Sequence, residues 1–166
     1  MSPVKIVAQS RWFTILQANP VDEILVGGEE VLVLAIDSDG SILFVEEPSP
    51  AFGGTQLFLP GGEREEGEDI PAAGLRELRE EAGFAARKVE FLGSLRPWSK
   101  YLRVTSHVVV ATDLYEAPLP ADETTPPILH RHTHDEVEAM LDSGELCDAR
   151  VVGALAMLKR RRPDIA

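Results

Sequence analysis

Residues 62–84 read GEREEGEDIPAAGLRELREEAGF, and they place three glutamates at helical spacing behind a glycine-rich loop. Pro71 suits the first position of a helix, where its missing N–H costs nothing. Gly83 suits the position just past the end of a helix. The residues between them are mostly good helix formers. The stretch therefore predicts a helix over residues 71–82, entered through a loop that ends at Gly62.

Apolar and acidic residues give this helix two predicted faces. The apolar stripe has the spacing i, i+3, i+7 and consists of Leu75, Leu78 and Ala82. The acidic residues fall on roughly the opposite side, and they are Glu77, Glu80 and Glu81. Like charges at this spacing destabilise a helix by about 0.2–0.5 kcal/mol per pair. Arg76 and Arg79 offset part of this repulsion, and a bound divalent cation would offset more. If periodicity alone is considered, a solvated charged face is favoured over a metal site.

The spacing of the whole stretch favours the metal site over the solvated face. The residues with a characteristic spacing are Gly62, Glu68, Arg76, Glu77, Leu78, Glu80, Glu81, Gly83 and Phe84. At all nine positions this pattern resembles the signature of the Nudix hydrolases, the Nudix box. The resemblance implies a loop–helix–loop that binds Mg²⁺, or Mn²⁺, and hydrolyses a diphosphate linked to another moiety.

The same resemblance implies roles for individual residues. The implied metal ligands are three carboxylates and one carbonyl oxygen, those of Glu77, Glu80, Glu81 and Gly61. Arg76 would orient Glu77, and Glu68 would hold Arg76. Independently of the family, diphosphate hydrolysis needs cations to neutralise the phosphate oxygens and to activate water. It also needs a base that accepts a proton. These requirements match a cluster of carboxylates beside an arginine.

Composition narrows the classes of partner. The net charge of −12 argues against nucleic-acid binding, which relies on a basic surface. The single cysteine, Cys147, excludes an intrachain disulfide framework. No run of about 18 apolar residues indicates a membrane span. We therefore expect one domain over residues 1–166 that is cytoplasmic and acts on a small nucleotide, without membrane or nucleic-acid partners.

The order of predicted elements is strands, helix, strands and two helices. The expected strands cover residues 4–18, 24–26, 30–36, 41–46, 56–59, 88–95, 104–114 and 128–132. Turns are expected at Gly27–Gly28 and over residues 37–40, where strand 41–46 returns to pair with strand 30–36. This order predicts an α/β or α+β fold with helices flanking a mixed sheet. It is consistent with the α-β-α sandwich of the Nudix fold.

Two helices are expected at the C-terminal end. Thr133 and Glu136 form a capping box, which predicts a helix that runs to about Asp142. The second helix is expected over residues 148–161, and its predicted buried side comprises Val151, Val152, Leu155 and Leu158.

The flanks of the box resemble the ADP-ribose pyrophosphatase branch of the family. The matching stretches are residues 7–13, 91–95, 108–115 and 148–155. This resemblance implies hydrolysis of ADP-ribose, NADH or diadenosine polyphosphates, with AMP as one product. It also implies a homodimer whose N-terminal strands, within residues 1–28, help to form the partner's site. A nucleoside triphosphate, a nucleotide sugar, or a nucleotide-binding module without turnover remain the alternatives.

Substrate contacts are expected from residues outside the box. Trp12 and Phe13 are candidates for the dimer interface or for adenine contact, with core packing as an equal alternative. Relatives carry a phosphate-binding arginine where this chain has Glu46–Glu47. The replacements available for phosphate contact are Arg11, Arg96, Lys100 and Arg103. Glu123, in a long polar loop, matches the position of a further catalytic carboxylate in this branch, acting as general base or outer metal contact.

Overall fold

Two long strands, β3 (Glu23–Ala35) and β8 (Leu102–Glu116), run parallel and form the centre of the larger sheet. The computed structural model describes residues 5–17, 19, 22–120 and 126–166. The sheet has the order β1-β2-β3-β8-β7, and β6 pairs with β3. The other strands are β1 (Lys5–Gln9), β2 (Thr14–Gln17), β6 (Gly61–Glu63) and β7 (Phe84–Leu95). Its remaining pairings are antiparallel, so the predicted mixed sheet is confirmed.

A second sheet contains β4 (Ile42–Pro48), β5 (Thr55–Phe58) and β9 (Ile128–His132) in the order β5-β4-β9. The turn over residues 37–40 is present, but the expected pairing of the two strands around it is wrong. Only an isolated bridge between Ile36 and Ile42 joins them. The reason is that β3 pairs with β8 along one edge and with β2 and β6 along the other. Strand β4 therefore pairs with β5 and β9 instead.

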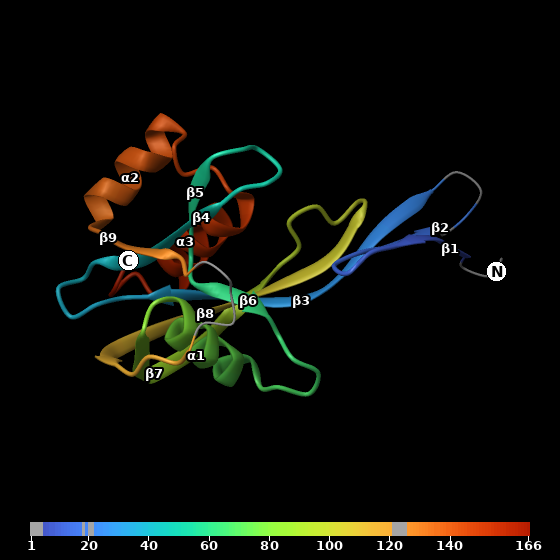
Figure 1. The fold of residues 1–166 in the computed structure, drawn as a ribbon. Helices are drawn as coiled ribbons and strands as arrows, with labels where there is room; N and C mark the ends of the chain where they lie inside the picture. The colour runs from blue at the N-terminus through green and yellow to red at the C-terminus, as the bar shows by residue number, and fades with distance from the viewer. Residues whose placement is uncertain (1–4, 18, 20–21, 121–125) are drawn as a thin grey trace.

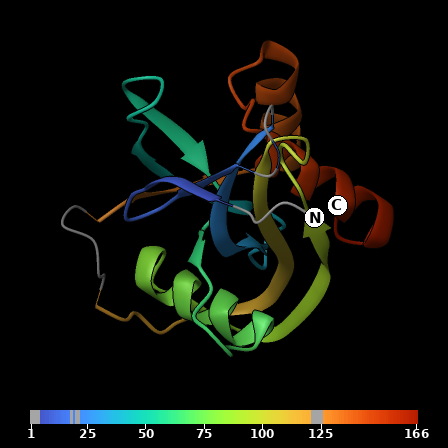
Figure 2. The same ribbon diagram turned by 90° about the vertical axis from the view of Figure 1, so that its right-hand side faces the viewer.

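Helices cover both faces of the larger sheet (Figures 1 and 2). Helix α1 (Ile70–Glu81) packs in a core cluster with Val31 and Val33 of β3. Helices α2 (His134–Ser143) and α3 (Ala149–Arg161) share the other cluster with Leu32 and Leu34. Successive side chains of a strand point to opposite faces, so β3 contributes to both clusters. This arrangement confirms the predicted sandwich. No helix within the described ranges is long and apolar enough to span a membrane.

Some local predictions were wrong. Gly27 and Gly28 lie within β3 and not in a turn, beside a register shift between Val26 and Glu29. Glycine within a strand often marks such an irregularity. In α3 the predicted Val151, Leu155 and Leu158 are buried, but the fourth buried residue is Ala154, because Val152 is 39% exposed. The capping box of α2 is confirmed, since Thr133 and Glu136 exchange both hydrogen bonds.

The N-terminal strands project from the rest of the molecule. In Figure 1, β1, β2 and the first part of β3 extend away from the layers formed by the other elements. Every residue of β1 is exposed. Large apolar side chains on this arm are also exposed, and they are Ile6, Val7, Trp12 and Phe13. The arm therefore presents apolar area that its own chain leaves uncovered.

Candidate active site

Strand β6 contains Gly61 and Gly62, leads through a short loop into α1 and binds the far end of that helix. Gly61 pairs with Leu32 of β3, and its N–H donates a 2.8 Å hydrogen bond to the Glu81 carboxylate near the end of α1. Pro71 lies in the first turn, one position later than predicted. The helix covers residues 70–81, one residue earlier than the predicted 71–82. The box therefore folds as a short strand, a loop and a helix anchored to the central strand.

The two glycines of β6 allow close contacts on either side. A Cβ at Gly61 would collide with the Val31 carbonyl oxygen. A Cβ at Gly62 would lie 2.7 Å from both carboxylate oxygens of Glu77, which is too close for a real contact. Glycine is thus required at Gly62 because the Glu77 carboxylate occupies the adjacent space.

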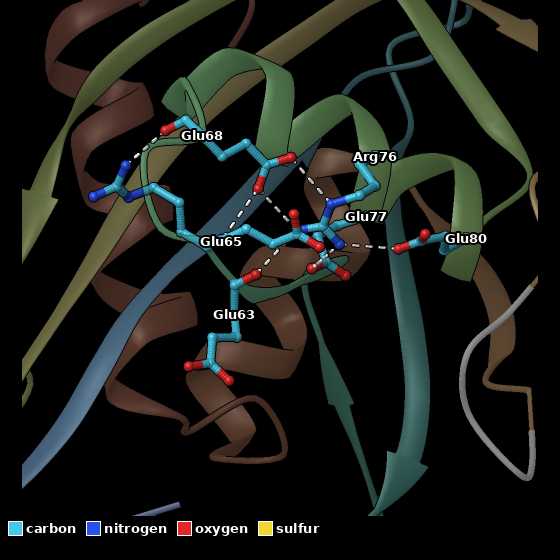
Figure 3. A network of polar contacts seen from close by, with 7 residues as sticks. Glu63, Glu65, Glu68, Arg76, Glu77 and Glu80 are labelled. Atoms are coloured by element: carbon cyan, nitrogen blue, oxygen red, sulfur yellow. Dashed lines mark hydrogen bonds and ion pairs between the residues drawn. The ribbon is translucent and has the colours of Figure 1, made fainter.

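Arg76 is the centre of a polar network that connects the loop to the helix (Figure 3). Its guanidinium donates to both oxygens of Glu68 at 3.1 Å, to Glu77 at 2.7 Å and to Glu80 at 3.0 Å. It also donates to the Glu63 carbonyl at 3.0 Å. Hydrogen bonds between charged groups are shorter and stronger than neutral ones. The Arg76 hydrogen bonds accordingly hold the pKa of Glu68 below its usual value, and Glu68 raises the pKa of Arg76.

Glu77 lies on the buried face of α1. It is 8% exposed and shares that face with Ala73, Gly74 and Leu78. The acidic side of the helix is therefore buried at Glu77, where β6 packs against it, whereas Glu80 and Glu81 are half-buried. A buried carboxylate is costly unless it is paired and hydrogen-bonded. Arg76 supplies that pairing, so the ion pair is part of what allows Glu77 to sit under β6.

The oxygen donors around β6 fit a hard divalent cation. Mg²⁺ takes carboxylate and carbonyl oxygens, keeps several waters, and commonly uses only one or two carboxylates together with substrate phosphates. In the described part of the chain, no three or more His, Cys, Asp or Glu side chains form a cage that could hold a metal ion. That is compatible with Mg²⁺ because it does not need such a cage. Arg76 also brings a single positive charge to three carboxylates, and a cation would offset their repulsion.

A cavity of about 360 Å³ connects the N-terminal arm to the start of the box. We call it the N-terminal cavity; Arg11, Trp12 and Phe13 line one side of it, and Gly62 and Glu63 line the other. The guanidinium of Arg11 lies over the Trp12 ring at 4.5 Å from its centroid. The structure therefore brings two predicted substrate residues, Arg11 and Trp12, to the side of the box.

A second cavity, of about 300 Å³, reaches Gly61 from the other sheet. We call it the loop cavity; it is bounded by the β4–β5 connection at residues 48–52, by Gly61 and by Arg150. Arg150 pairs with Glu30 at 2.9 Å and with Asp148 at 3.1 Å. Burial on its own raises the pKa of Asp148, but the hydrogen bonds and charge of Arg150 outweigh it, and the pKa is lowered.

Sequence reasoning did not identify Arg150 or Glu30 as site residues. Their side chains are 120 positions apart in the chain, and no local spacing indicates that they meet. Only the family resemblance of residues 148–155 pointed to this part of α3. The Glu30 carboxylate also accepts a hydrogen bond from Ser106, so this side chain of β3 joins β8 to α3.

The remaining predicted residues lie elsewhere. Arg96, Lys100 and Arg103 are exposed and line neither of the two cavities. Glu123 lies outside the described residues. The chain that leads toward it is bound to α1, since the Leu119 N–H donates to the Arg79 carbonyl at 3.1 Å. Of the two glutamates that replace the arginine of relatives, Glu47 lines the loop cavity, and Glu46 binds Thr55 and His130.

Comparison with known proteins identifies the family. The family described as NUDIX domain matches residues 28–161, a span that includes β6, α1 and the Arg76 network. The chain belongs to the Nudix family. It is therefore a Nudix pyrophosphohydrolase, with the α/β sandwich that its sequence predicts.

Individual Nudix relatives share most of the chain. The ADP compounds hydrolase NudE of Escherichia coli (strain K12) is 30% identical over 94% of this chain and 89% of its own length. The ADP-ribose pyrophosphatase of Bacillus subtilis (strain 168) is 28% identical over 78% of this chain and 71% of its own. A crystal structure of an ADP compounds hydrolase superposes with a TM-score of 0.82 at 28% identity, covering 96% of this chain and 91% of that one. The protein is thus related to hydrolases of ADP compounds.

Proposed function

We propose that this Nudix protein is a Mg²⁺-dependent hydrolase, with Mn²⁺ as an alternative cation, that cleaves the diphosphate linkage of ADP-linked compounds. Its substrates would be ADP-ribose, NADH and diadenosine polyphosphates, and AMP would be one product. The observation that carries this proposal is the Arg76 network, which holds Glu77 and Glu80 beside β6. The similarity to NudE over 94% of the chain supports the substrate class.

The carboxylates of Glu77, Glu80 and Glu81 and the carbonyl oxygen of Gly61 would hold the cation. When bound, the cation neutralises phosphate oxygens and lowers the pKa of a water molecule. Arg76 is a positioning residue, because its hydrogen bonds orient Glu77 and Glu80. We assign proton acceptance to Glu123. Leu119, four residues before Glu123, is hydrogen-bonded to Arg79 of α1. A few residues of extended chain can span the distance from there to the carboxylates of the same helix.

The N-terminal cavity would receive the adenosine half of the substrate. The Trp12 ring supplies a stacking surface and the adjacent Arg11 a positive charge. Aromatic rings bind bases of any identity by such stacking. Arg96 and Arg103 line neither cavity in a single copy, so their phosphate contacts would be made through a second protomer.

We also propose that the protein is a homodimer joined through the N-terminal arm. Contiguous exposed apolar surface is a common sign of a protein interface. The arm exposes Ile6, Val7, Trp12 and Phe13, and it extends away from the body of its own chain (Figure 1). A second copy covering this arm would remove the apolar area from water and place the arm near both active sites.

AMP release from ADP-ribose, NADH and diadenosine triphosphate in the presence of Mg²⁺ tests the proposed function. Glu81→Gln should lower kcat by more than about a hundredfold, because even substitutions outside the inner metal shell cost up to that factor. Glu66→Gln, which removes an exposed carboxylate from the preceding loop, is the matched control and should remain active. Circular dichroism checks that both variants fold. Tight binding of all three compounds without any AMP release would instead indicate a binding module.

A further inference from the structure

The β4–β5 connection places an aromatic ring, Phe52, at the rim of the loop cavity. Phe52 is 82% exposed and belongs to the lining of that cavity. Single exposed apolar residues are common on protein surfaces, so exposure alone indicates nothing. The position of this ring is more informative, because the same cavity is also lined by Gly61, whose carbonyl we assign to the metal. A ligand held at Gly61 can therefore extend along the cavity to Phe52.

The connection that carries Phe52 is internally hydrogen-bonded. The Ser49 N–H donates to Gly54 at 2.9 Å, and the Ser49 carbonyl accepts from Phe52 at 3.2 Å and Gly53 at 2.7 Å. Gly53 and Gly54 have φ of +76° and +71°, a region that glycine adopts easily. Pro50 further restricts the backbone. The ring is therefore presented by a preformed turn, which lowers the entropy lost when a ligand is bound.

The charges of the loop cavity indicate what part of a nucleotide it receives. Its charged lining residues are Glu30, Glu47, Asp148 and Arg150. Arg150 is held by Glu30 and Asp148, so the walls carry an excess of negative charge. Such walls disfavour an additional phosphate, whereas carboxylates accept hydrogen bonds from sugar hydroxyls. The volume of about 300 Å³ is at the lower limit for ligand pockets, which suits one sugar and one ring.

We propose that Phe52 stacks on a planar ring in the second half of the substrate. The loop cavity would then favour dinucleotides, whose second half ends in a nicotinamide or adenine ring, over ADP-ribose, whose second half is a sugar alone. This inference rests on the proposed function, because it takes the diphosphate to lie at Gly61. It adds a specificity-determining residue that lies outside the Nudix box and belongs to the second sheet.

Steady-state kinetics of the wild-type protein, Phe52→Ala and Phe52→Tyr test this assignment with NADH, diadenosine triphosphate and ADP-ribose. Loss of one stacked ring should raise KM about tenfold for the two dinucleotides. The KM for ADP-ribose should change by less than about twofold, because the second half of ADP-ribose has no ring that could stack on Phe52. The kcat for all three substrates should also change by less than about twofold, because the substitution does not touch the metal site. Phe52→Tyr keeps the ring and should restore the wild-type KM.

An equal change of KM for all three substrates, or no change for any, would overturn the role of Phe52. A shift in oligomeric state with Phe52→Ala and no difference between substrates would also overturn it and assign the ring to an interface. If the wild-type protein releases AMP from none of the compounds, the proposed function fails. Calorimetric binding of the same ligands then still decides the role of Phe52, because stacking requires no turnover. A loss of affinity in Phe52→Ala that is confined to the dinucleotides supports the stacking role of Phe52. Affinities that are the same in Phe52→Ala and in the wild-type protein refute that role.

Discussion

Glu68 links the loop before α1 to Arg76 through two hydrogen bonds, and its protonation state controls both. Its pKa is lowered in the folded protein because Arg76 donates to it. A lowered pKa means that the unfolded chain binds the proton more readily than the folded one. The stabilisation is therefore complete at neutral pH and is lost as pH falls through the folded pKa, below the usual value of 4.5.

Glu68→Gln should consequently destabilise the protein at pH 7 by about 1 kcal/mol, because it replaces a charged hydrogen bond of roughly 1.5–3 kcal/mol by a neutral one of about 1 kcal/mol. The melting temperature should fall by about 2–4 °C. The difference from wild type should shrink as pH falls from neutral through the lowered pKa of Glu68, a range in which Glu68 becomes protonated in the wild-type protein too. Thermal melts across this range measure it, with Glu66→Gln as the control. A difference that stays the same from pH 7 to below the pKa of Glu68 would contradict the ion pair as its source.

At the scale of residues, sequence spacing predicted which side chains cluster around the box but not how they are buried. The structure contains both expected contacts of Arg76, to Glu68 and to Glu77. The helical wheel places Glu77 away from the apolar stripe, but it cannot show that β6 covers that side of the helix. The space beside Gly62 that receives the Glu77 carboxylate has no signature in periodicity. The pairing of Glu30 with Arg150 joins distant parts of the chain, so local sequence spacing could not predict it either.

Helix α1 reaches the larger sheet through a glycine, which makes its packing sensitive to one added methyl group. A Cβ at Gly74 would lie 2.8 Å from a methyl group of Val109, which is fully buried in β8. Alanine improves helix propensity by about 1 kcal/mol relative to glycine. Overpacking a close-packed core costs about 1–3 kcal/mol. Because Val109 is short and confined, we expect the overpacking cost to be the larger of the two.

Gly74→Ala should therefore lower the melting temperature, and it should also reduce AMP release because α1 carries the metal-binding carboxylates. Gly153→Ala in α3 is the matched control. Its Cβ would approach the end of the Leu95 side chain at 2.9 Å, but Leu95 is half-buried and flexible. Gly153→Ala should leave the melting temperature unchanged or raise it, because the gain in helix propensity is not offset by overpacking. Equal effects of the two substitutions on the melting temperature would show that propensity and not packing dominates.

At the scale of elements, local signals predicted helices better than the division into two sheets. Proline, glycine and a capping box mark the ends of α1 and α2 within about one residue. Strand partners depend on which edges are already occupied, and a hairpin turn does not report this. The pair Gly27–Gly28 has the composition of a turn, yet a Cβ at Gly27 would lie 2.7 Å from Val104. Close approach of neighbouring side chains explains these glycines, and it is a tertiary effect.

At the scale of the whole molecule, the projecting arm makes the N-terminal cavity depend on residues far from the box. Trp12 is 59% exposed at the turn between β1 and β2, and it lines that cavity together with Gly62. Trp98 has the same exposure of 59% but lines neither cavity. The two tryptophans therefore form a matched pair that separates a general effect of losing an exposed ring from an effect of position.

Trp12→Ala should raise KM for ADP-ribose about tenfold, the loss expected for one stacked base, or shift a homodimer toward monomer on a sizing column. Trp98→Ala should do neither. Measuring KM at several protein concentrations separates the two effects, because a weakened dimer recovers at high concentration and a lost stacking contact does not. If neither KM nor oligomeric state changes with Trp12→Ala, the arm has no part in substrate binding or assembly. The N-terminal cavity would then be a surface feature, and the adenosine half would have to bind elsewhere along β6.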